Sequence, residues 1–297
     1  MSEIGTTQQF VDNNEAIEAW DGVLFDRFVE FRKGLVAGLG AHGNKALELY
    51  PPAPGERAID IGCGFGDTTR DIARLVAPGG EAVGVDASPR FIAASREEAA
   101  AEGVENVRYE VADVEAGLPE EVGREFDRVF SRMGTMFFAN PVPAMRNIRA
   151  TMRPGALLTM VVWRQKAENV FMYDAEQITE RFLTHPDQTD EPTCGPGPFS
   201  MANADTTSGI MKAAGYEDVT LTRSDHPMWQ GDTIEEALDL VMAIGPAGEL
   251  IRVNEERGEE LRPQIVEALQ EGLAQYVTDD GVYAQTSTWI VAARNPG

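Results

Sequence analysis

The chain has 297 residues, of which 43% are hydrophobic and 25% are charged, values typical of a globular protein with one large domain or two small ones. Its 49 acidic and 25 basic residues give a formal net charge of -24 at pH 7. Binding to nucleic acid or to anionic membranes depends on a basic surface. The charge therefore argues against both, and we expect no nucleic-acid partner.

Targeting and redox features are few. Residues 1–9 contain no basic stretch followed by an apolar one, so they do not resemble a signal peptide. No apolar run approaches the ~20 residues of a membrane helix. The cysteines, Cys63 and Cys194, are too few to form a disulfide framework in a chain of this length. We expect no membrane insertion and a cytoplasmic location with reduced thiols.

The first half of the chain predicts helices that alternate with short apolar strands. Residues 1–50 are expected to form an N-terminal helical cap segment, with apolar residues at helical spacing in a helix over 13–50. The expected strands are 57–61, 82–86, 107–111, 126–130 and 157–163, and helices are expected to begin at Asp67, at Ser88 and near Pro143. This alternation predicts βαβ units and a parallel sheet that is covered on both faces.

The pattern changes after the fifth expected strand. Residues 165–205 are polar and rich in turn formers, so we expect a loop that acts as a lid or insert. Residues 206–297 are expected to complete the core sheet with strands at 219–222 and 286–293. Between these strands, a capping box at Thr233 and an apolar helical stripe from Leu261 to Leu273 predict a helical substrate-cap insert at about 232–276.

A glycine-rich segment, residues 59–66, joins the first expected strand to the next helix. Its glycines at positions 62, 64 and 66 allow a tight turn and a close approach to a ligand. A dinucleotide fingerprint would place the third glycine one residue later, and Asp67 would oppose a pyrophosphate at the helix start. No Gly-Lys-Ser/Thr follows, so a phosphate loop is excluded. The segment favours a ligand that has a cationic amine and no phosphates.

Two further carboxylates follow neighbouring strands. Asp86 ends the second strand, 20 residues beyond Gly66, where a carboxylate accepts hydrogen bonds from both hydroxyls of a ribose. Asp113 follows the third strand and is placed to accept from an adenine amino group, with the backbone N–H of Val114 beside it. The carboxyl ends of parallel strands meet at one edge of a sheet, so these positions predict a nucleoside site. S-adenosylmethionine, which has no phosphate, fits this pattern.

With these motifs the sequence resembles the class I S-adenosylmethionine-dependent methyltransferases, in the branch of the ubiquinone and menaquinone C-methylases. The matching pieces are residues 59–66, 83–86, 112–113, 126–129 and 152–158, so the resemblance covers roughly residues 50–165 and the last strands. It implies a Rossmann-like, doubly wound α/β fold with seven strands, six parallel and the last antiparallel, and a helical cap. It also implies S-adenosyl-L-methionine as cofactor and S-adenosyl-L-homocysteine as product.

The resemblance assigns the cofactor contacts to residues 51–164, the expected Rossmann-like core. The methionine part would lie against Asp60 and the three glycines, the ribose against Asp86 and the adenine against Asp113. Cys63 is expected to pack inside the glycine loop and not to act as a nucleophile. The complete expected set is Asp60, Gly62, Cys63, Gly64, Gly66, Thr68, Asp86, Ala87, Ala112, Asp113, Val114, Ser131, Arg132 and Met133.

Aromatic and methionine residues supply candidates for an apolar acceptor pocket, although core packing is the alternative for each one. The main candidates are Trp20, Phe25, Met136, Phe137, Trp163, Tyr173 and Trp229, with Phe138, Met172, Met228 and Met242 beside them. If the reaction uses a general base, His42 and His226 are the candidates, because imidazole titrates near neutrality. The scattered histidines and cysteines have no metal-ligand spacing, so we expect no metal.

The expected activity is methyl transfer, by in-line displacement, to an O, C or N nucleophile of a small and largely apolar molecule. The Asp/Asn-Pro-Pro-aromatic signature of amino methylation is absent at residues 131–134. Two alternatives stay open: a non-catalytic S-adenosylmethionine-binding or regulatory protein, and an NAD-dependent oxidoreductase. The glycine spacing and the lack of a Tyr-x-x-x-Lys pair disfavour the oxidoreductase. The oligomeric state is left open, with a homodimer as one option.

Overall fold

The computed structural model describes residues 13–185 and 197–297. Two expectations from the sequence, about residues 1–9 and about the thiol of Cys194, lie outside these ranges. Within the described ranges, none of the helices combines the length and the hydropathy that a bilayer crossing requires.

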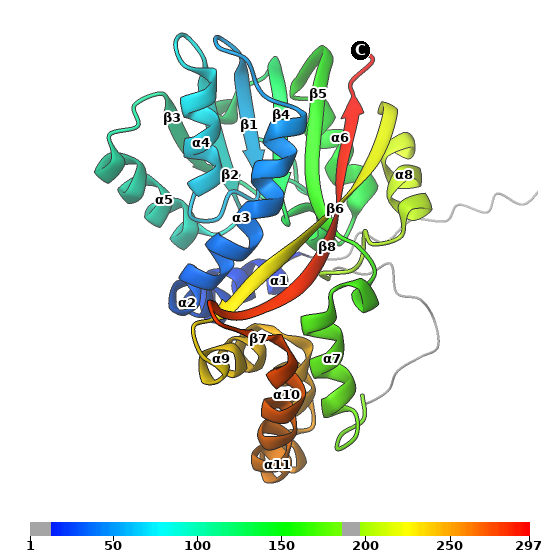
Figure 1. Cartoon of the computed structure of the whole chain (residues 1–297). Coiled ribbons are helices and arrows are strands. Elements are labelled where there is room, and N and C mark those ends of the chain that lie inside the picture. The colour runs from blue at the N-terminus through cyan, green and yellow to red at the C-terminus, as the bar shows by residue number, and fades with distance from the viewer. Residues whose placement is uncertain (1–12, 186–196) are drawn as a thin grey trace, which may run out of the picture.

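One mixed sheet forms the centre of the upper part of the molecule (Figure 1). Its strand order is β3-β2-β1-β4-β5-β8-β6, and the two-residue strand β7 pairs with β8. Strands β1 to β5 pair in parallel, whereas β8 is antiparallel to both β5 and β6. The strands are β1 (Arg57–Ile61), β2 (Glu81–Asp86), β3 (Val107–Val111), β4 (Phe126–Arg132), β5 (Met152–Trp163), β6 (Glu217–Gly231), β7 (Val277–Thr278) and β8 (Gly281–Arg294). The predicted Rossmann-like α/β fold with an antiparallel last strand is confirmed.

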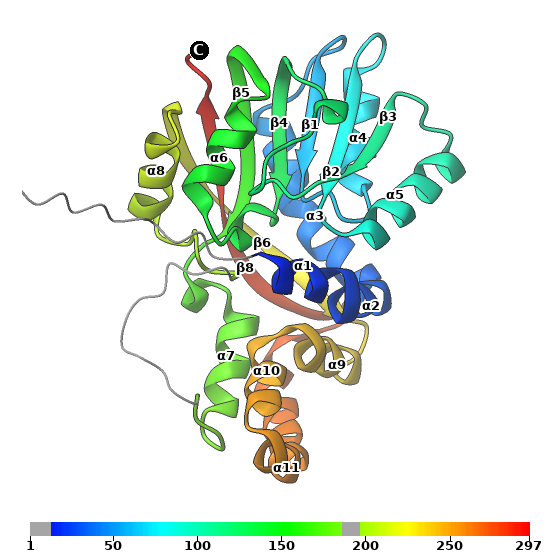
Figure 2. The ribbon, with the colours of Figure 1, turned by 180° about the vertical axis from the view of Figure 1, so that it is seen from behind.

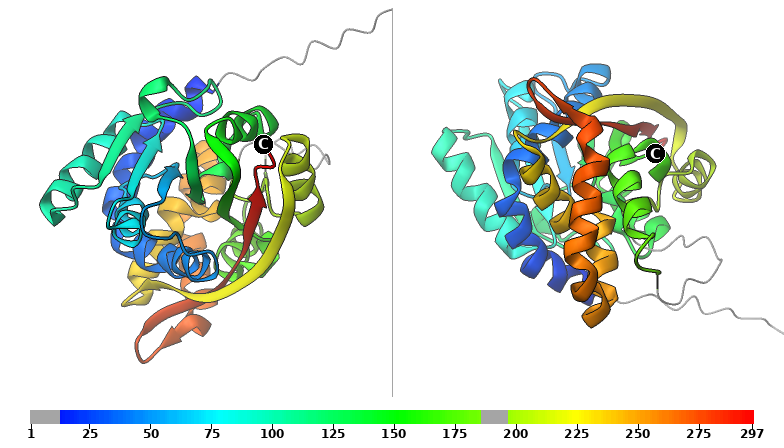
Figure 3. Two further views of the ribbon diagram at one scale, coloured as in Figure 1. Left: turned by 90° about the horizontal axis from the view of Figure 1, so that it is seen from above. Right: turned by 60° about the horizontal axis from the view of Figure 1, so that its bottom comes forward.

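Strands β6 and β8 are much longer than the sequence pattern predicted. They have 15 and 14 residues and remain paired from Thr220 opposite Ala292 to Trp229 opposite Tyr283. In β6, residues 223–226 are all polar and do not alternate with apolar residues, so the sequence pattern does not indicate a strand there. Figure 3 shows the two strands following one curved path. They connect the sheet to the lower helices (Figure 1).

Alternate residues of the strands serve the two faces of the sheet. Ile59 belongs to an apolar cluster that includes Met145 and Ile148 of α6, whereas its neighbour Ala58 belongs to a cluster with Ile72 of α4. Helices α3 and α4 cover one face, and α6 and α8 cover the other (Figures 1 and 2). These helices and α5 are α3 (Arg32–Leu49), α4 (Asp67–Val76), α5 (Pro89–Glu102), α6 (Pro141–Arg149) and α8 (Ala204–Ala213).

The N-terminal segment is a series of short helices. It consists of α1 (Asn14–Ala19), a π-helical turn η1 (Trp20–Leu24), α2 (Phe25–Glu30) and α3. The single helix expected over 13–50 is interrupted at Gly22, whose φ of -104° and ψ of -110° are not helical, and again at Phe31, with φ -97° and ψ 16°. These breaks let α1 and α2 lie across the lower end of the sheet, between it and the lower helices (Figure 2).

The lower helices share an apolar core of their own. They are α7 (Val170–Thr179), α9 (Ile234–Ile244), α10 (Pro246–Val253) and α11 (Glu255–Leu273). The hydroxyl of Thr233 accepts from the backbone N–H of Glu236, as the capping box predicted. The members of this core include Phe171, Ala175, Ile178, Leu238, Val241, Leu250, Ile251, Leu261, Ile265, Leu269 and Leu273.

Two of these helices were not expected. Helix α7 lies inside the segment 165–205, for which the sequence predicted a polar loop. Phe171, Ala175 and Ile178 stand at positions i, i+4 and i+7, so they give α7 one apolar face toward the lower core. Helix α10 was also missed. Four 3-10 turns complete the described chain: η2 (Glu120–Val122), η3 (Thr135–Phe137), η4 (Lys166–Glu168) and η5 (Ala274–Tyr276).

Candidate functional site

The glycine loop exposes backbone atoms without side chains at the carboxyl end of β1. Gly62, Gly64 and Gly66 all have positive φ values, of 68°, 54° and 73°. A Cβ atom on Gly66 would lie 2.6 Å from the Tyr109 ring, and one on Gly62 would lie 3.0 Å from the Cα atom of Gly134. A Cβ atom on Gly64 would meet only the Phe91 ring, at 4.0 Å. The first and last glycines are thus required by close packing, whereas Gly64 leaves room for a ligand.

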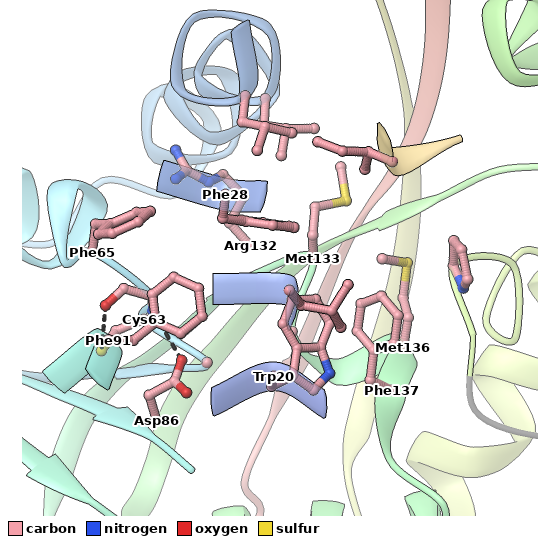
Figure 4. Close-up of a pocket in the computed structure, with 18 of the residues that line it drawn as sticks. Trp20, Phe28, Cys63, Phe65, Asp86, Phe91, Arg132, Met133, Met136 and Phe137 are labelled. Carbon is pink, nitrogen blue, oxygen red and sulfur yellow. Dashed lines mark hydrogen bonds between the residues drawn. The ribbon is translucent and has the colours of Figure 1, made fainter. Parts of the chain in front are cut away.

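A cavity of about 400 Å³ lies between this loop and the helices that cover it (Figure 4). One side is formed by residues that follow β1, β2, β3 and β4, which is where parallel sheets bind their ligands. We call this side the cofactor half. The other side is formed by Trp20, by apolar side chains of α3, η3, α7 and α9, and by side chains of strands β5, β6 and β8, and we call it the acceptor half. Arg32, at the start of α3, is counted with the cofactor half.

Asp86 connects the second strand to the glycine loop. Its Oδ2 accepts from the backbone N–H of Gly64 at 3.0 Å, and its Oδ1 accepts from that of Ser88 at 3.0 Å. Burial raises the pKa of Asp86, and these N–H donors oppose the rise. Each carboxylate oxygen can accept a second hydrogen bond. Asp86 lines the cavity beside Cys63 (Figure 4), so it can accept both hydroxyls of a ribose.

Asp113 stands at the next position along the sheet edge. Its Oδ1 accepts from the backbone N–H of Glu115 at 2.9 Å and from the amide of Asn13 at 3.4 Å. Ala87, Ala112, Asp113 and Val114, four of the expected cofactor residues, all line the cavity. Three small apolar side chains beside a carboxylate fit a purine ring with an exocyclic amino group.

An ion pair lies on the other side of β1, between the end of β4 and the start of α4. A guanidinium nitrogen of Arg132 lies 2.7 Å from Oδ2 of Asp67, and both side chains line the cavity. The next residue, Met133, has a left-handed φ of 63° and donates its N–H to the carbonyl of Val161 at 2.9 Å. Strained backbone of this kind is often found at functional sites. A carboxylate beside a guanidinium fits the zwitterionic end of an amino acid.

Several expected cofactor residues lie behind the cavity wall. Asp60 is 2% exposed and accepts from the hydroxyl of Thr69 at 2.7 Å. Burial raises the pKa of Asp60 to about 7, against the bond from Thr69 and the charge of Arg132. Because strand residues alternate, Asp60 points toward α4 while Ile61 reaches the cavity. Gly66, Thr68 and Ser131 also lie off the wall; the hydroxyl of Ser131 donates to the carbonyl of Ile61 at 2.7 Å.

The acceptor candidates divide into two groups. Trp20 packs edge-to-face on Phe137, with ring centroids 5.0 Å apart, and both residues line the cavity with Met136 (Figure 4). Trp163, Phe138, Met172 and Met228 line it too. Phe25, Tyr173, Trp229 and Met242 are not on the wall; Phe25 packs on Phe65 and Phe91, and Trp229 lies under the amine of Lys33.

The sequence did not predict the wall residues of the covering helices. These are mainly apolar: Ala16, Ile17, Leu24, Phe28, Leu35, Val36, Leu39, Phe171, Leu240 and Ile244. The helical spacing of Leu35 and Leu39 marked an apolar face, but that pattern does not say what the face covers.

Neither candidate base lies on the cavity wall. His42 is completely buried; its Nε2 lies 2.8 Å from Thr286 Oγ1 and its Nδ1 lies 3.0 Å from Thr288 Oγ1. Burial lowers the pKa of His42 to about 4, with a further lowering by His226. The rings of His42 and His226 are 5.0 Å apart. Thr286 does line the cavity, so His42 reaches the site only through this hydroxyl.

One group of residues outside the cavity has the proximity of metal ligands within the described ranges: Glu176, Glu180 and His185. The amine of Lys166 already binds both carboxylate oxygens of Glu176, at 2.9 and 2.7 Å. The ammonium group of Lys166 therefore already supplies the positive charge that pairs with the buried carboxylate of Glu176.

The N-terminal helices are held over the cofactor half by charged contacts. Oδ1 of Asp21 accepts from the hydroxyl of Ser88 at 2.6 Å and from the backbone N–H of Arg90 at 2.9 Å, at the start of α5. These two bonds lower the pKa of Asp21. Arg32 lines the cavity, pairs with Glu98 and lies over the Phe65 ring. The N-terminal segment is therefore attached next to the end of β2.

The charges of the cofactor half discriminate between nucleotides. Asp67, Asp86 and Asp113 line it, and the guanidinium groups of Arg32 and Arg132 are already paired with carboxylates. A pyrophosphate would meet net negative charge here. The amino groups, hydroxyls and sulfonium of S-adenosylmethionine suit the same surroundings, so the residues present fit this group.

Fold and site together define a class I methyltransferase architecture. The family model described as a methyltransferase domain matches residues 52–207, more than half of the chain. The chain belongs to this methyltransferase family. The predicted methyltransferase family and its cofactor, S-adenosyl-L-methionine, are confirmed.

Curated relatives share parts of the chain. It is 27% identical over 198 residues to the ubiquinone/menaquinone biosynthesis C-methyltransferase UbiE of Stutzerimonas stutzeri, covering 59% of this chain and 70% of UbiE. Identity to the aklanonic acid methyltransferase DauC of a Streptomyces species is 34% over 104 residues, 35% of this chain and 46% of DauC. For the 23S rRNA (uracil(1939)-C(5))-methyltransferase RlmD of a Shewanella species it is 39% over 74 residues, 25% of this chain and 16% of RlmD. The match thus spans less than half the length of DauC and RlmD.

Solved structures show the same fold. The YcgJ protein of Bacillus subtilis superposes with a TM-score of 0.53 at 17% identity, covering 87% of this chain and 98% of YcgJ. The phosphoethanolamine N-methyltransferase 2 of Haemonchus contortus, solved with S-adenosyl-L-methionine, gives 0.52 at 19% identity, covering 97% of this chain and 60% of the enzyme.

Proposed function

We propose that this protein transfers the methyl group of S-adenosylmethionine to an oxygen, carbon or nitrogen atom of a small, largely apolar molecule. The observation that carries the proposal is one continuous cavity with two unlike halves. Its cofactor half carries the carboxylates at the strand ends, and its acceptor half is almost entirely apolar. A cofactor and an apolar acceptor can therefore meet inside one enclosure.

Each part of the cofactor has residues that would hold it. Asp86 would accept the ribose hydroxyls, and Asp113 would accept the adenine amino group. The Asp67–Arg132 pair would bind the amino and carboxylate groups of the methionine part. When bound, the cofactor supplies an electrophilic methyl group on a cationic sulfur. The aromatic rings of Trp20 and Phe28 on the cavity wall would suit a cation.

The acceptor half contributes alignment and exclusion of water. Trp20, Phe137 and Met136 form its wall near the glycine loop, and Trp163 and Met228 continue it. Correct alignment of two reactants can lower a barrier by ~7–11 kcal/mol. Charge is neutralised when an anionic nucleophile attacks a sulfonium, so an apolar enclosure favours that step. The helical cap, formed by residues 13–50 and 232–276 together with α7, would supply this enclosure.

A small acceptor is also supported by charge and by the relatives. RlmD is named as an rRNA methyltransferase, so the family alone does not exclude nucleic acid. The net charge of -24 opposes binding to a polyanion. The names of UbiE and DauC refer to quinone biosynthesis and to aklanonic acid. We therefore propose a small molecule as the acceptor and expect no nucleic-acid partner.

Titration calorimetry tests the cofactor assignment. The wild type is expected to bind S-adenosylhomocysteine and not NADH. Asp86→Ala removes two hydrogen bonds to a charged acceptor, each worth about 1.5–3 kcal/mol, so affinity should fall by about 100-fold or more. Asp71→Ala, on the exposed surface of α4, is the matched control and should bind like the wild type. Binding of NADH in place of S-adenosylhomocysteine would refute the proposal in favour of an oxidoreductase. Turnover with any acceptor would exclude a purely regulatory protein.

A further inference from the structure

Polar side chains are rare in the acceptor half. Among the described residues that line it, the polar side chains besides the indole N–H groups of Trp20 and Trp163, which donate only, are those of Asn169 and Thr286; the other polar wall residues belong to the cofactor half. In an apolar pocket, a few polar groups fix the orientation of the ligand. Asn169 and Thr286 are therefore the candidates for a group that recognises the acceptor.

The amide of Asn169 is used by the protein itself. Its Oδ1 accepts from the backbone N–H of Ser287 at 2.8 Å. Its Nδ2 faces the carbonyls of Gln165 and Arg164, at 3.2 and 3.4 Å. The residue is completely buried at the start of α7. Asn169 thus ties α7 to β8 and has no donor left for a ligand.

Thr286 differs because its neighbours leave part of its hydroxyl free. Its Oγ1 lies 2.8 Å from His42 Nε2 and 2.8 Å from the carbonyl of His226. On the far side of the imidazole, Thr288 Oγ1 lies 3.0 Å from Nδ1 and 3.3 Å from the carbonyl of Ser224. A row of buried polar groups thus runs from the cavity wall through His42 to strand β6.

The three protons of this row, one on each hydroxyl and one on the neutral imidazole, satisfy three of its four contacts in either tautomer of His42. With the proton on Nε2, the imidazole donates to Thr286, whose hydroxyl donates to the carbonyl of His226, and Thr288 donates to Nδ1. With the proton on Nδ1, the imidazole donates to Thr288, which donates to the carbonyl of Ser224, and Thr286 donates to Nε2. A hydroxyl has one donor and two acceptor positions. In both arrangements Thr286 Oγ1 keeps at least one acceptor position without a partner among the described residues.

Resting on the proposed function, we propose that Thr286 determines acceptor specificity by accepting a hydrogen bond from an O–H or N–H group of the acceptor. His42 is its positioning residue: in either tautomer the Thr286 hydroxyl donates to His42 or to the carbonyl of His226 and keeps an acceptor position for the cavity, which His42 itself does not reach. The acceptor is then an apolar molecule with a hydroxyl or amino group. A molecule that offers only a carbonyl or ether oxygen at this point gains nothing from the contact.

The surroundings of His42 are consistent with a neutral positioning group. The imidazole of His42, on α3, faces His226 and Asp225 of β6 and the edge of Trp163 of β5. The buried ring has its two nitrogens occupied by the threonine hydroxyls of β8.

A thermodynamic cycle tests the inference, with the same exchange of hydroxyl for methyl made on the ligand and on the protein. The probes are 2-naphthol and 2-methylnaphthalene, measured by equilibrium dialysis on the protein saturated with S-adenosylhomocysteine. Thr286→Val should lower the ratio of naphthol to methylnaphthalene affinity by roughly 2- to 13-fold, the range for one net hydrogen bond. Thr286→Ser keeps the hydroxyl and should retain most of the preference, and His42→Phe should reduce it.

The controls separate this contact from general damage to the pocket. Met228→Leu, on the same wall without a hydroxyl, should change the affinity for both probes by a similar factor. Loss of stability in a variant would by itself lower the affinity for both probes by the same factor and leave the ratio of the two affinities unchanged. An unchanged ratio in Thr286→Val, or no binding of 2-naphthol to the saturated wild type, overturns the inference. Absence of S-adenosylhomocysteine binding by the wild type would instead contradict the proposed function.

Discussion

Asp60 should give this protein a stability that depends on pH in an unusual direction. Burial raises its pKa to about 7, from 3.8 in the unfolded chain. Between these values the folded chain retains a proton that the unfolded chain has released, so this contribution to the free energy of unfolding falls as pH rises. One pKa unit corresponds to about 1.4 kcal/mol, so the whole shift corresponds to roughly 4 kcal/mol and the part above pH 5.5 to about 2 kcal/mol.

Replacing Asp60 with Asn isolates this contribution. The Asn amide oxygen still accepts from Thr69 but does not ionise, so Asp60→Asn should gain about 2 kcal/mol over the wild type between pH 5.5 and pH 8. The assay is urea unfolding at both pH values, with Asp71→Asn as a control for the loss of one negative charge. A difference between variant and wild type that does not grow with pH would refute the reasoning, because it would show that folded Asp60 gives up its proton as readily as the unfolded chain does.

Three further outcomes follow from the same contacts. Gly66→Ala would force a Cβ atom to 2.6 Å from the Tyr109 ring at a φ of 73°, so thermal unfolding should show a loss of about 2 kcal/mol or more, and an unchanged melting temperature would contradict this packing. Burial lowers the pKa of His42 to about 4 from 6.5, so as the pH falls the unfolded chain takes up a proton that the folded chain does not. The free energy of unfolding of the wild type should therefore fall by about 2 kcal/mol relative to that of His42→Gln between pH 6.5 and pH 5. The same pH dependence for both proteins in urea unfolding would argue against a neutral buried imidazole. Asp21→Ala removes the bonds to Ser88 and Arg90, so limited proteolysis should cut residues 14–30 faster, and an unchanged rate would show that these bonds do not hold the segment.

The sheet and its carboxylates could be predicted because each signal is local. The apolar runs around Ile59 and Val83 indicate buried strands, and the carboxyl ends of such strands meet at one edge. Asp86 and Asp113 therefore lie in the cavity as expected. Asp60 was harder to place, because the alternation of the strand, and not the motif, decides whether a residue faces the loop or the helix behind it.

The acceptor half could be predicted only by residue type. Trp20 and Trp163 lie on its wall whereas Tyr173 and Trp229 do not, and composition cannot tell these pairs apart. The direction of each side chain is set by how α7 and β6 pack against distant elements. Thr286 carried no sequence signal, because its importance comes from His42, 244 residues earlier in the chain.

In the proposed complex, the strand-end carboxylates and the glycine loop hold S-adenosylmethionine. The most direct measurement is a crystal structure of the complex with S-adenosylhomocysteine. It should show both ribose hydroxyls within about 2.6–3.0 Å of the Asp86 carboxylate oxygens, with the adenine amino group beside Asp113. A ribose bound away from Asp86, or a nucleoside bound outside the cavity, would contradict the account.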